Sequence, residues 1–171
     1  MKWAALVALI SCCVLALGQE VEVTPGKGSI LLSLEAQKSY QWLASEQKQP
    51  TLSVQCAQKG KKSVHLLLFT AQSSVMEDDP ETAGRGGQLT FHMTIGTTKQ
   101  VTTWIPYGDA VTYAYYGKTE PDRVQFLQHL LNAPTASIQF KPFLTGTKVI
   151  SVFDVAKLRE EMDKHPECSL K

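Results

Sequence analysis

Apolar and polar residues alternate with a period of two along most of the chain after residue 29. Ile30, Leu32 and Leu34, for example, fall on one side of an extended segment, and polar residues such as Ser33 fall on the other. Alternation of this kind predicts β-strands with one buried face. The predicted strands are residues 30–36, 51–56, 64–70, 89–95, 100–105, 111–116, 136–141 and 148–153.

The segment 64–70 differs from the other strands because it is apolar on both sides. Leu66 and Leu68 alternate with Leu67 and Phe69, which predicts a central strand covered on both faces. His65 lies near its start. A histidine in such a run is expected to be partly buried and hydrogen-bonded.

Two segments have the 3.6-residue period of helices. The first follows Thr119-Glu120-Pro121-Asp122, a start that resembles a capping box, and ends at Asn132-Ala133-Pro134. The second begins after Asp154 and ends at His165-Pro166. The predicted fold is therefore mainly β, an antiparallel β-sandwich or strongly curved sheet with two short α-helices. One domain is expected over residues 29–171, after a flexible lead-in at 19–28 that ends in turn-forming residues.

The first 18 residues have the pattern of a cleavable signal peptide. One lysine, Lys2, precedes an uncharged apolar run that is too short for a transmembrane helix, which needs about 20 apolar residues. Cleavage is expected before Gln19, and the mature chain is expected to have no membrane span. Leu9-Ile10-Ser11-Cys12 also fits a bacterial lipobox, so a lipoprotein anchored through Cys12 is the alternative.

The net charge and the lack of a glycosylation motif limit which compartment and which partners are expected. Removing residues 1–18 takes away one lysine and no acid, which leaves 16 of the 17 basic residues against 16 acidic ones. A net charge of zero predicts no overall attraction to nucleic acid or to an anionic membrane surface. Asn132 is followed by Ala133-Pro134, so the chain has no N-glycosylation sequon. These features favour an exported bacterial protein, periplasmic or extracellular.

Two cysteines, Cys56 and Cys168, remain after the signal peptide is removed. An even pair in an exported chain predicts a disulfide. The alternative is a redox or metal-binding thiol, which usually has a CxxC spacing that is absent here. Cys56 falls on the apolar side of its strand, so the bond is expected to pin the C-terminal helix against the sheet.

The C-terminal half resembles the exported VasI-like proteins associated with type VI secretion, and related bacterial envelope domains of unknown function. The resemblance lies in a strand that ends at Cys56, in the apolar pattern of residues 126–133 and 138–143, and in a helix after Phe153-Asp154 that leads to Cys168. It covers residues 50–168 and implies a shared fold and an envelope partner, but no catalytic residue.

Candidate catalytic chemistry is sparse. The sequence has no HExxH, GxSxG or P-loop motif, and no metal or cofactor is predicted. The acidic residues Glu77, Asp78, Asp79 and Glu81 lack the spacing of a calcium loop, and a hydrated loop is expected there. The enzymatic alternative is a small extracytoplasmic hydrolase that uses His65 or His92 with an acid.

Aromatic residues are dense between residues 104 and 116. They are Trp104, Tyr107, Tyr113, Tyr115 and Tyr116. Aromatic side chains are enriched in contact surfaces, which favours a non-catalytic binding or scaffolding domain that contacts an envelope protein through this hairpin. Strand alternation gives the competing interpretation, in which half of these side chains line the core. The oligomeric state is not predicted.

Overall fold

The computed structural model of the chain describes residues 20–40, 49–60, 62–71, 88–108, 111–141 and 146–170. The predicted signal segment 1–18, Cys12 included, and the acidic residues 77–81 lie outside these ranges. The described strands are β1 (Glu22–Gly26), β2 (Ser29–Glu35), β3 (Lys38–Tyr40), β4 (Thr51–Lys59), β5 (Lys62–Thr70), β6 (Leu89–Ile95), β7 (Thr98–Pro106), β8 (Thr112–Tyr115), β9 (Ala136–Phe140) and β10 (Val149–Phe153). The helices are α1 (Glu120–Leu131), α2 (Val155–Met162) and the short 3₁₀ helix η1 (Pro166–Cys168).

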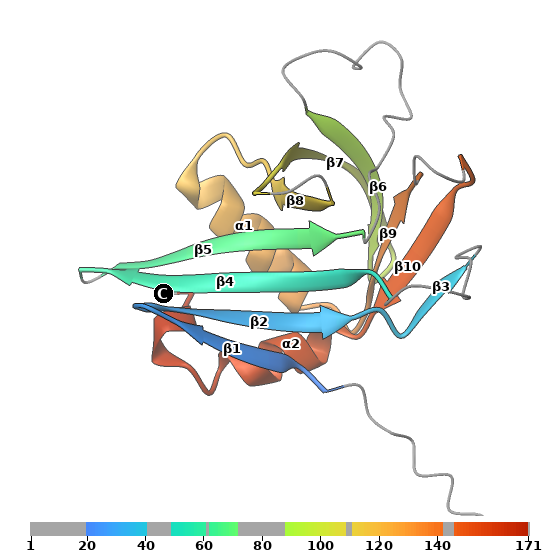
Figure 1. The fold of residues 1–171 in the computed structure, drawn as a ribbon. Helices are drawn as coiled ribbons and strands as arrows, with labels where there is room; N and C mark the ends of the chain where they lie inside the picture. The colour runs from blue at the N-terminus through green and yellow to red at the C-terminus, as the bar shows by residue number, and fades with distance from the viewer. Residues whose placement is uncertain are drawn as a thin grey trace, which may run out of the picture.

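All ten described strands form one antiparallel sheet in the order β1-β2-β4-β5-β8-β7-β6-β9-β10-β3. β2 and β3 are nearly continuous in sequence but lie towards opposite ends of this order. The linking residues bridge both ends, because Ala36 donates to the carbonyl of Pro50 and Gln37 donates to that of Val152. The sheet is therefore strongly curved, and its edge strands β1 and β3 leave it open (Figure 1). The predicted mainly β fold with two helices is confirmed.

Both α-helices cover the inner face of the curved sheet, behind β2, β4 and β5 in Figure 1. α1 packs against β5, and α2 packs against β2. The inward residues of the strands and the apolar faces of the helices form one core. Phe69 lies at its centre, with no exposed surface, and meets four aromatic rings edge-on or nearly so, those of Phe91, Trp104, Phe140 and Phe153.

The predicted lead-in is wrong for residues 22–26. They form β1, which pairs with β2 from Glu22 opposite Ser33 to Gly26 opposite Ser29. Every residue of β1 is exposed. An edge strand of this kind has no buried face to produce an apolar alternation, so its sequence carries no strand signal.

β5 is covered less completely than its sequence predicts. Leu67 and Phe69 face the core and are buried, as expected. On the other face Leu68 is 7% exposed, but Val64 is 36% exposed. The outer face of this strand is therefore buried only towards its C-terminal end.

β8 is too short to pair with the whole length of β5. On β5, β8 pairs only with Leu68–Thr70, and the chain then turns through Gly117 into α1. A Cβ atom at Gly117 would lie 2.5 Å from Cγ of Arg123, so this tight turn requires glycine. The N-terminal half of β5 has α1 as its neighbour in place of a further strand, and the candidate site lies there.

Candidate functional site

A groove of about 960 Å³ lies between α1, the C-terminal end of α2, η1 and the end of the β4–β5 hairpin. This volume falls in the range of ligand pockets. Its lining includes apolar side chains from both helices, Val124, Leu131 and Met162 among them, and charged residues of both signs. The charged residues are Lys62, Glu120, Arg159 and Asp163.

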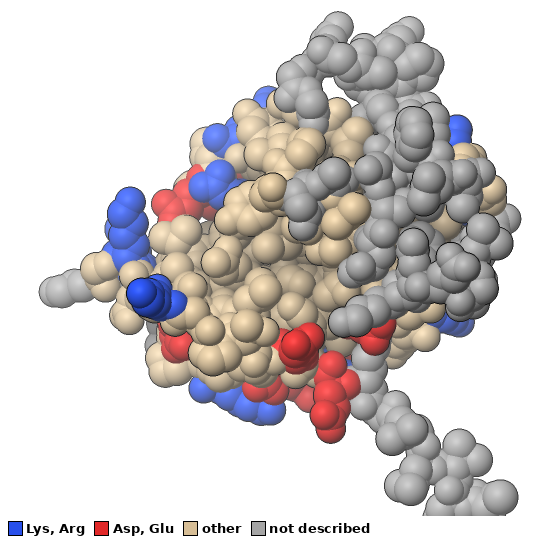
Figure 2. All heavy atoms as spheres, in the orientation of Figure 1, with Lys and Arg blue, Asp and Glu red and all other residues tan. Residues whose placement is uncertain are grey.

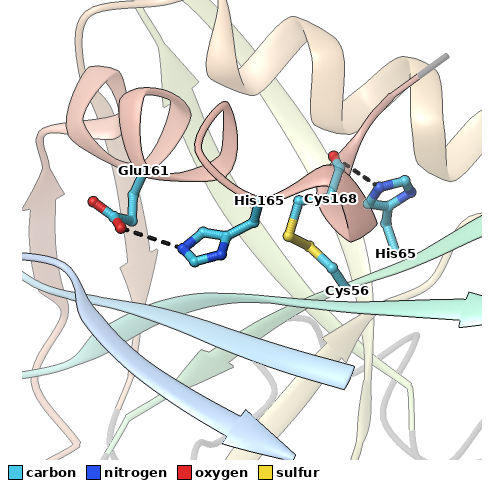
Figure 3. Close-up of a disulfide and its surroundings, with 5 residues drawn as sticks. All are labelled: Cys56, His65, Glu161, His165 and Cys168. Atoms are coloured by element: carbon cyan, nitrogen blue, oxygen red, sulfur yellow. Dashed lines mark hydrogen bonds and ion pairs between the residues drawn. A yellow bond between two sulfur atoms is a disulfide. The ribbon is translucent and has the colours of Figure 1, made fainter. Parts of the chain in front are cut away.

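His65 lies in the wall of this groove. It is inward-facing on β5 and only 7% exposed. Its Nε2 lies 3.1 Å from the carbonyl oxygen of Cys168 (Figure 3). A carbonyl only accepts, so Nε2 carries the proton and the neutral ring has a bare lone pair on Nδ1. Nδ1 is buried and has no hydrogen-bond partner in the described structure.

The His65 ring is held in its neutral form. Burial lowers its pKa from the ordinary value of 6.5, and this effect exceeds those of the Cys168 carbonyl and the Glu120 carboxylate, which both raise the pKa. At neutral pH, Nδ1 is therefore a hydrogen-bond acceptor without a donor. A buried acceptor in this condition costs about 1–3 kcal/mol relative to a satisfied one.

The predicted disulfide between Cys56 and Cys168 is present, with an S–S distance of 2.07 Å and the Cα atoms 5.1 Å apart. It joins β4 to η1, and both residues are buried. Before η1, Glu161 accepts from Lys164 at 2.6 Å and lies 3.3 Å from Nε2 of His165 (Figure 3). The hydrogen bond from Lys164 is the main reason that the pKa of Glu161 is lowered. These contacts fix the chain that forms one wall of the groove.

α1 forms the opposite wall and starts with the capping box that the sequence predicts. The backbone N–H of Asp122 donates to Oγ1 of Thr119 at 3.3 Å, and the N–H of Thr119 donates to the Asp122 carboxylate at 3.0 Å. One turn before the end of the helix, Gln128 donates to the carbonyl of Leu170 at 3.2 Å. The chain after Cys168 therefore lines the groove and is held by α1.

The five predicted aromatic residues do not form one surface. Trp104 is fully buried and Tyr113 is 3% exposed, so the prediction of a surface role is wrong for these two, which face inward by strand alternation. Tyr115 is half-buried and stacks on Phe126 of α1 with ring centroids 4.0 Å apart. Tyr107 and Tyr116 are each 43% exposed. They follow the C-terminal residues of β7 and β8, at opposite ends of the paired segment.

His92 lies away from the groove, on the outer face of the sheet. It stands opposite Val101 on β7 and Gln139 on β9, in a hollow of about 400 Å³. In the described ranges, neither His92 nor His65 has a hydrogen bond or ion pair with a carboxylate. A general base needs an orienting neighbour of that kind, and the two histidines lack it there.

Within the described part of the chain, no three His, Cys, Asp or Glu side chains are grouped so as to hold a metal ion. No described helix has the length and apolar character needed to cross a bilayer.

Comparison with known proteins does not assign a family. No family model, no curated protein and no solved structure matches the chain. The resemblance to VasI-like proteins therefore stays a prediction.

Sequence reasoning identifies His65 as partly buried and hydrogen-bonded, and this is confirmed. It misses the other groove residues, such as Glu120, Gln128 and Arg159. Gln128 lies on the polar, exposed side of α1, but periodicity does not tell which polar residues face a groove and which face open solvent. The capping box is the available signal, because it fixes where α1 begins.

Proposed function

We propose that the chain is an exported, non-catalytic binding domain of the bacterial cell envelope, and that its ligand occupies the groove beside His65. The observation that carries the proposal is the buried, neutral His65 ring with an acceptor nitrogen that lacks a donor, in the wall of a groove of ligand size. Buried polar groups are nearly always paired, so an exception at a groove points to a ligand that supplies the missing group.

Export is supported by the signal-like N-terminus and by the disulfide, because such bonds persist in oxidising compartments. The VasI-like resemblance supports an envelope location. Lining charges of both signs favour a neutral or zwitterionic ligand, small or peptide-like, with an N–H or O–H group for Nδ1. In the described ranges no carboxylate binds His65 or His92, and this weighs against the hydrolase alternative.

A blocking variant tests the site. Ser63 and Asn132 line the groove from β5 and from the end of α1, so Ser63→Arg and Asn132→Arg place long charged side chains there. Thr94→Arg, in the hollow near His92, is the matched control. Each protein is incubated with fractionated envelope extract and examined by native mass spectrometry for retained molecules.

The proposal predicts that a molecule retained by the unmodified chain and by Thr94→Arg is lost from both groove variants. The retained molecule should leave unchanged on denaturation, whereas a hydrolase would release cleaved products. Retention by the groove variants at the unmodified level would contradict the groove as the site, and a failure of every fraction to yield a retained molecule would contradict a binding role.

A further inference from the structure

The two hairpin turns at one end of the sheet bring lysines together. Lys27 lies in the β1–β2 turn, and Lys59 and Lys62 flank the β4–β5 turn. The turns are neighbours, because the N–H of Gln58 lies 3.4 Å from the carbonyl of Gly28. Strands in a sheet are about 5 Å apart, so the three Cα positions span only roughly 10–15 Å.

These lysines are not neutralised within the described structure. All three are exposed, and no hydrogen bond or ion pair holds any of their ammonium groups in the described ranges. Lys59 and Lys62 are also direct cross-strand partners, so their side chains share one face. Like charges placed opposite each other destabilise a strand pair, and an anion bound between them would relieve the repulsion.

Uncharged surface adjoins the lysines on the outer face of the sheet. Ala57 and Val64 are cross-strand partners one step inward from Lys59 and Lys62, and Val64 is 36% exposed. Leu31, Gln55 and Leu66 form the next row. Figure 2 shows blue basic atoms at this end, to the left, and a mainly tan, uncharged surface to their right.

We propose that this end of the sheet, comprising Lys27, Lys59, Lys62 and Val64, docks on an anionic lipid bilayer. Basic side chains next to an exposed apolar side chain are the combination that binds the headgroup region, with the ammonium groups on lipid phosphates and the apolar group at the acyl boundary. The net charge of zero predicts no such attraction, but net charge does not describe how the fold distributes its charges. The proposal rests on the export proposed above and not on a groove ligand; of its four residues, Lys62 also lines the groove.

Vesicle binding tests the proposal. The protein is expressed from a full-length gene with Cys12→Ser, so that it cannot be lipidated at that residue, and is purified after export. It is then sedimented with vesicles of 30% phosphatidylglycerol in phosphatidylcholine, or with vesicles of phosphatidylcholine alone. Binding is expected to the anionic vesicles only, and to be lost at high salt. Each lysine near an anionic surface contributes about fivefold in affinity, so Lys59→Gln with Lys62→Gln should weaken binding about 25-fold.

Two sets of variants distinguish a bilayer from a soluble polyanion and from a general charge effect. Lys99→Gln with Lys157→Gln removes the same charge elsewhere, in the β6–β7 turn region and on α2, and should leave binding unchanged. Val64→Ser removes two methyl groups and should weaken vesicle binding by about fourfold for each one that is buried in the bilayer, without changing binding to soluble polyphosphate.

No binding to the anionic vesicles would overturn the proposal, as would equal losses from both lysine pairs. Tight polyphosphate binding together with a Val64→Ser chain that sediments normally would also overturn it, in favour of a soluble polyanion. None of these outcomes affects the groove variants, so failure here is distinguishable from failure of the proposed binding site.

Discussion

Cys56 and His65 stand directly opposite each other on β4 and β5, and both hold Cys168. Cys56 does so through the disulfide, and His65 does so through the hydrogen bond from Nε2 to the Cys168 carbonyl. The two partners are 112 and 103 residues away from Cys168 in sequence. One residue of η1 is thus bonded to two adjacent strands, and His65 and Cys168 lie in the wall of the proposed binding groove.

His65 should make the stability of the protein depend on pH. Its pKa is lowered by burial, so the unfolded chain, in which the ring has its ordinary pKa of 6.5, takes up a proton before the folded chain does. This contribution to stability is full above pH 6.5 and is lost as the pH falls towards the lower folded-state pKa. The free energy of unfolding, measured by urea titration between pH 7.5 and 4.5, should therefore decrease.

The matched variant is His65→Gln, whose amide can still donate to the Cys168 carbonyl but does not titrate. Its free energy of unfolding should fall less steeply with decreasing pH over the same range. An identical slope in the two proteins would show that other groups cause the dependence.

Loss of the disulfide should destabilise the protein strongly. Closing a loop of this length is worth about 4–5 kcal/mol in the chain-entropy model. Replacing both cysteines, as Cys56→Ala with Cys168→Ala, should lower the urea midpoint accordingly and expose the backbone of η1 to hydrogen exchange. In the unmodified protein, thiol reagents should label neither residue before reduction. Native labelling of both would contradict the bond.

A buried hydrogen-bond chain supports Trp104. Its indole Nε1 donates to Oγ1 of Thr102 at 2.8 Å, and that hydroxyl donates to the carbonyl of Phe91 at 3.1 Å. Thr102→Val keeps the shape but leaves the indole N–H unpaired, and should cost about 1–3 kcal/mol. Thr102→Ser retains the hydroxyl and should recover most of this loss in thermal unfolding. A valine variant as stable as the serine variant would be inconsistent with the chain.

The capping box of α1 should contribute to both stability and the groove. Thr119→Ala removes the hydroxyl that accepts from Asp122, and such a change costs about 1 kcal/mol. Hydrogen exchange should accelerate in the first turn of α1, next to Glu120. Thr119→Ser, which preserves the acceptor, should behave like the unmodified protein; equal acceleration in the two variants would argue against the cap.

The sequence predicts those features that depend on local pattern. The alternation at Leu52, Val54 and Cys56 correctly places the cysteine inward, and Thr119 correctly marks the start of α1. β3 is missed because three residues are too short for a period to show. β1 is missed because none of its residues is buried.

The groove and the lysine end could not be predicted, because both depend on the order of strands. Nothing local indicates that β8 stops after pairing with three residues of β5, or that the β1–β2 turn lies beside the β4–β5 turn. The density of aromatic residues around Trp104 in the sequence suggests a contact surface. The strand register turns the Trp104 side chain into the core instead. Residues that are close in the sequence therefore need not be close in the sheet.

The central claim is that a ligand bound in the groove supplies the donor that the buried Nδ1 of His65 lacks, and imidazole nitrogen NMR tests it most directly. In uniformly ¹⁵N-labelled protein at pH 7.5, His65 should have its proton on Nε2 and an Nδ1 shift typical of a bare lone pair. Adding the envelope fraction that is retained in mass spectrometry should move the Nδ1 signal in the direction of a hydrogen-bonded acceptor. A proton on Nδ1 in the free protein, or an Nδ1 signal that the ligand leaves unchanged, would contradict the claim.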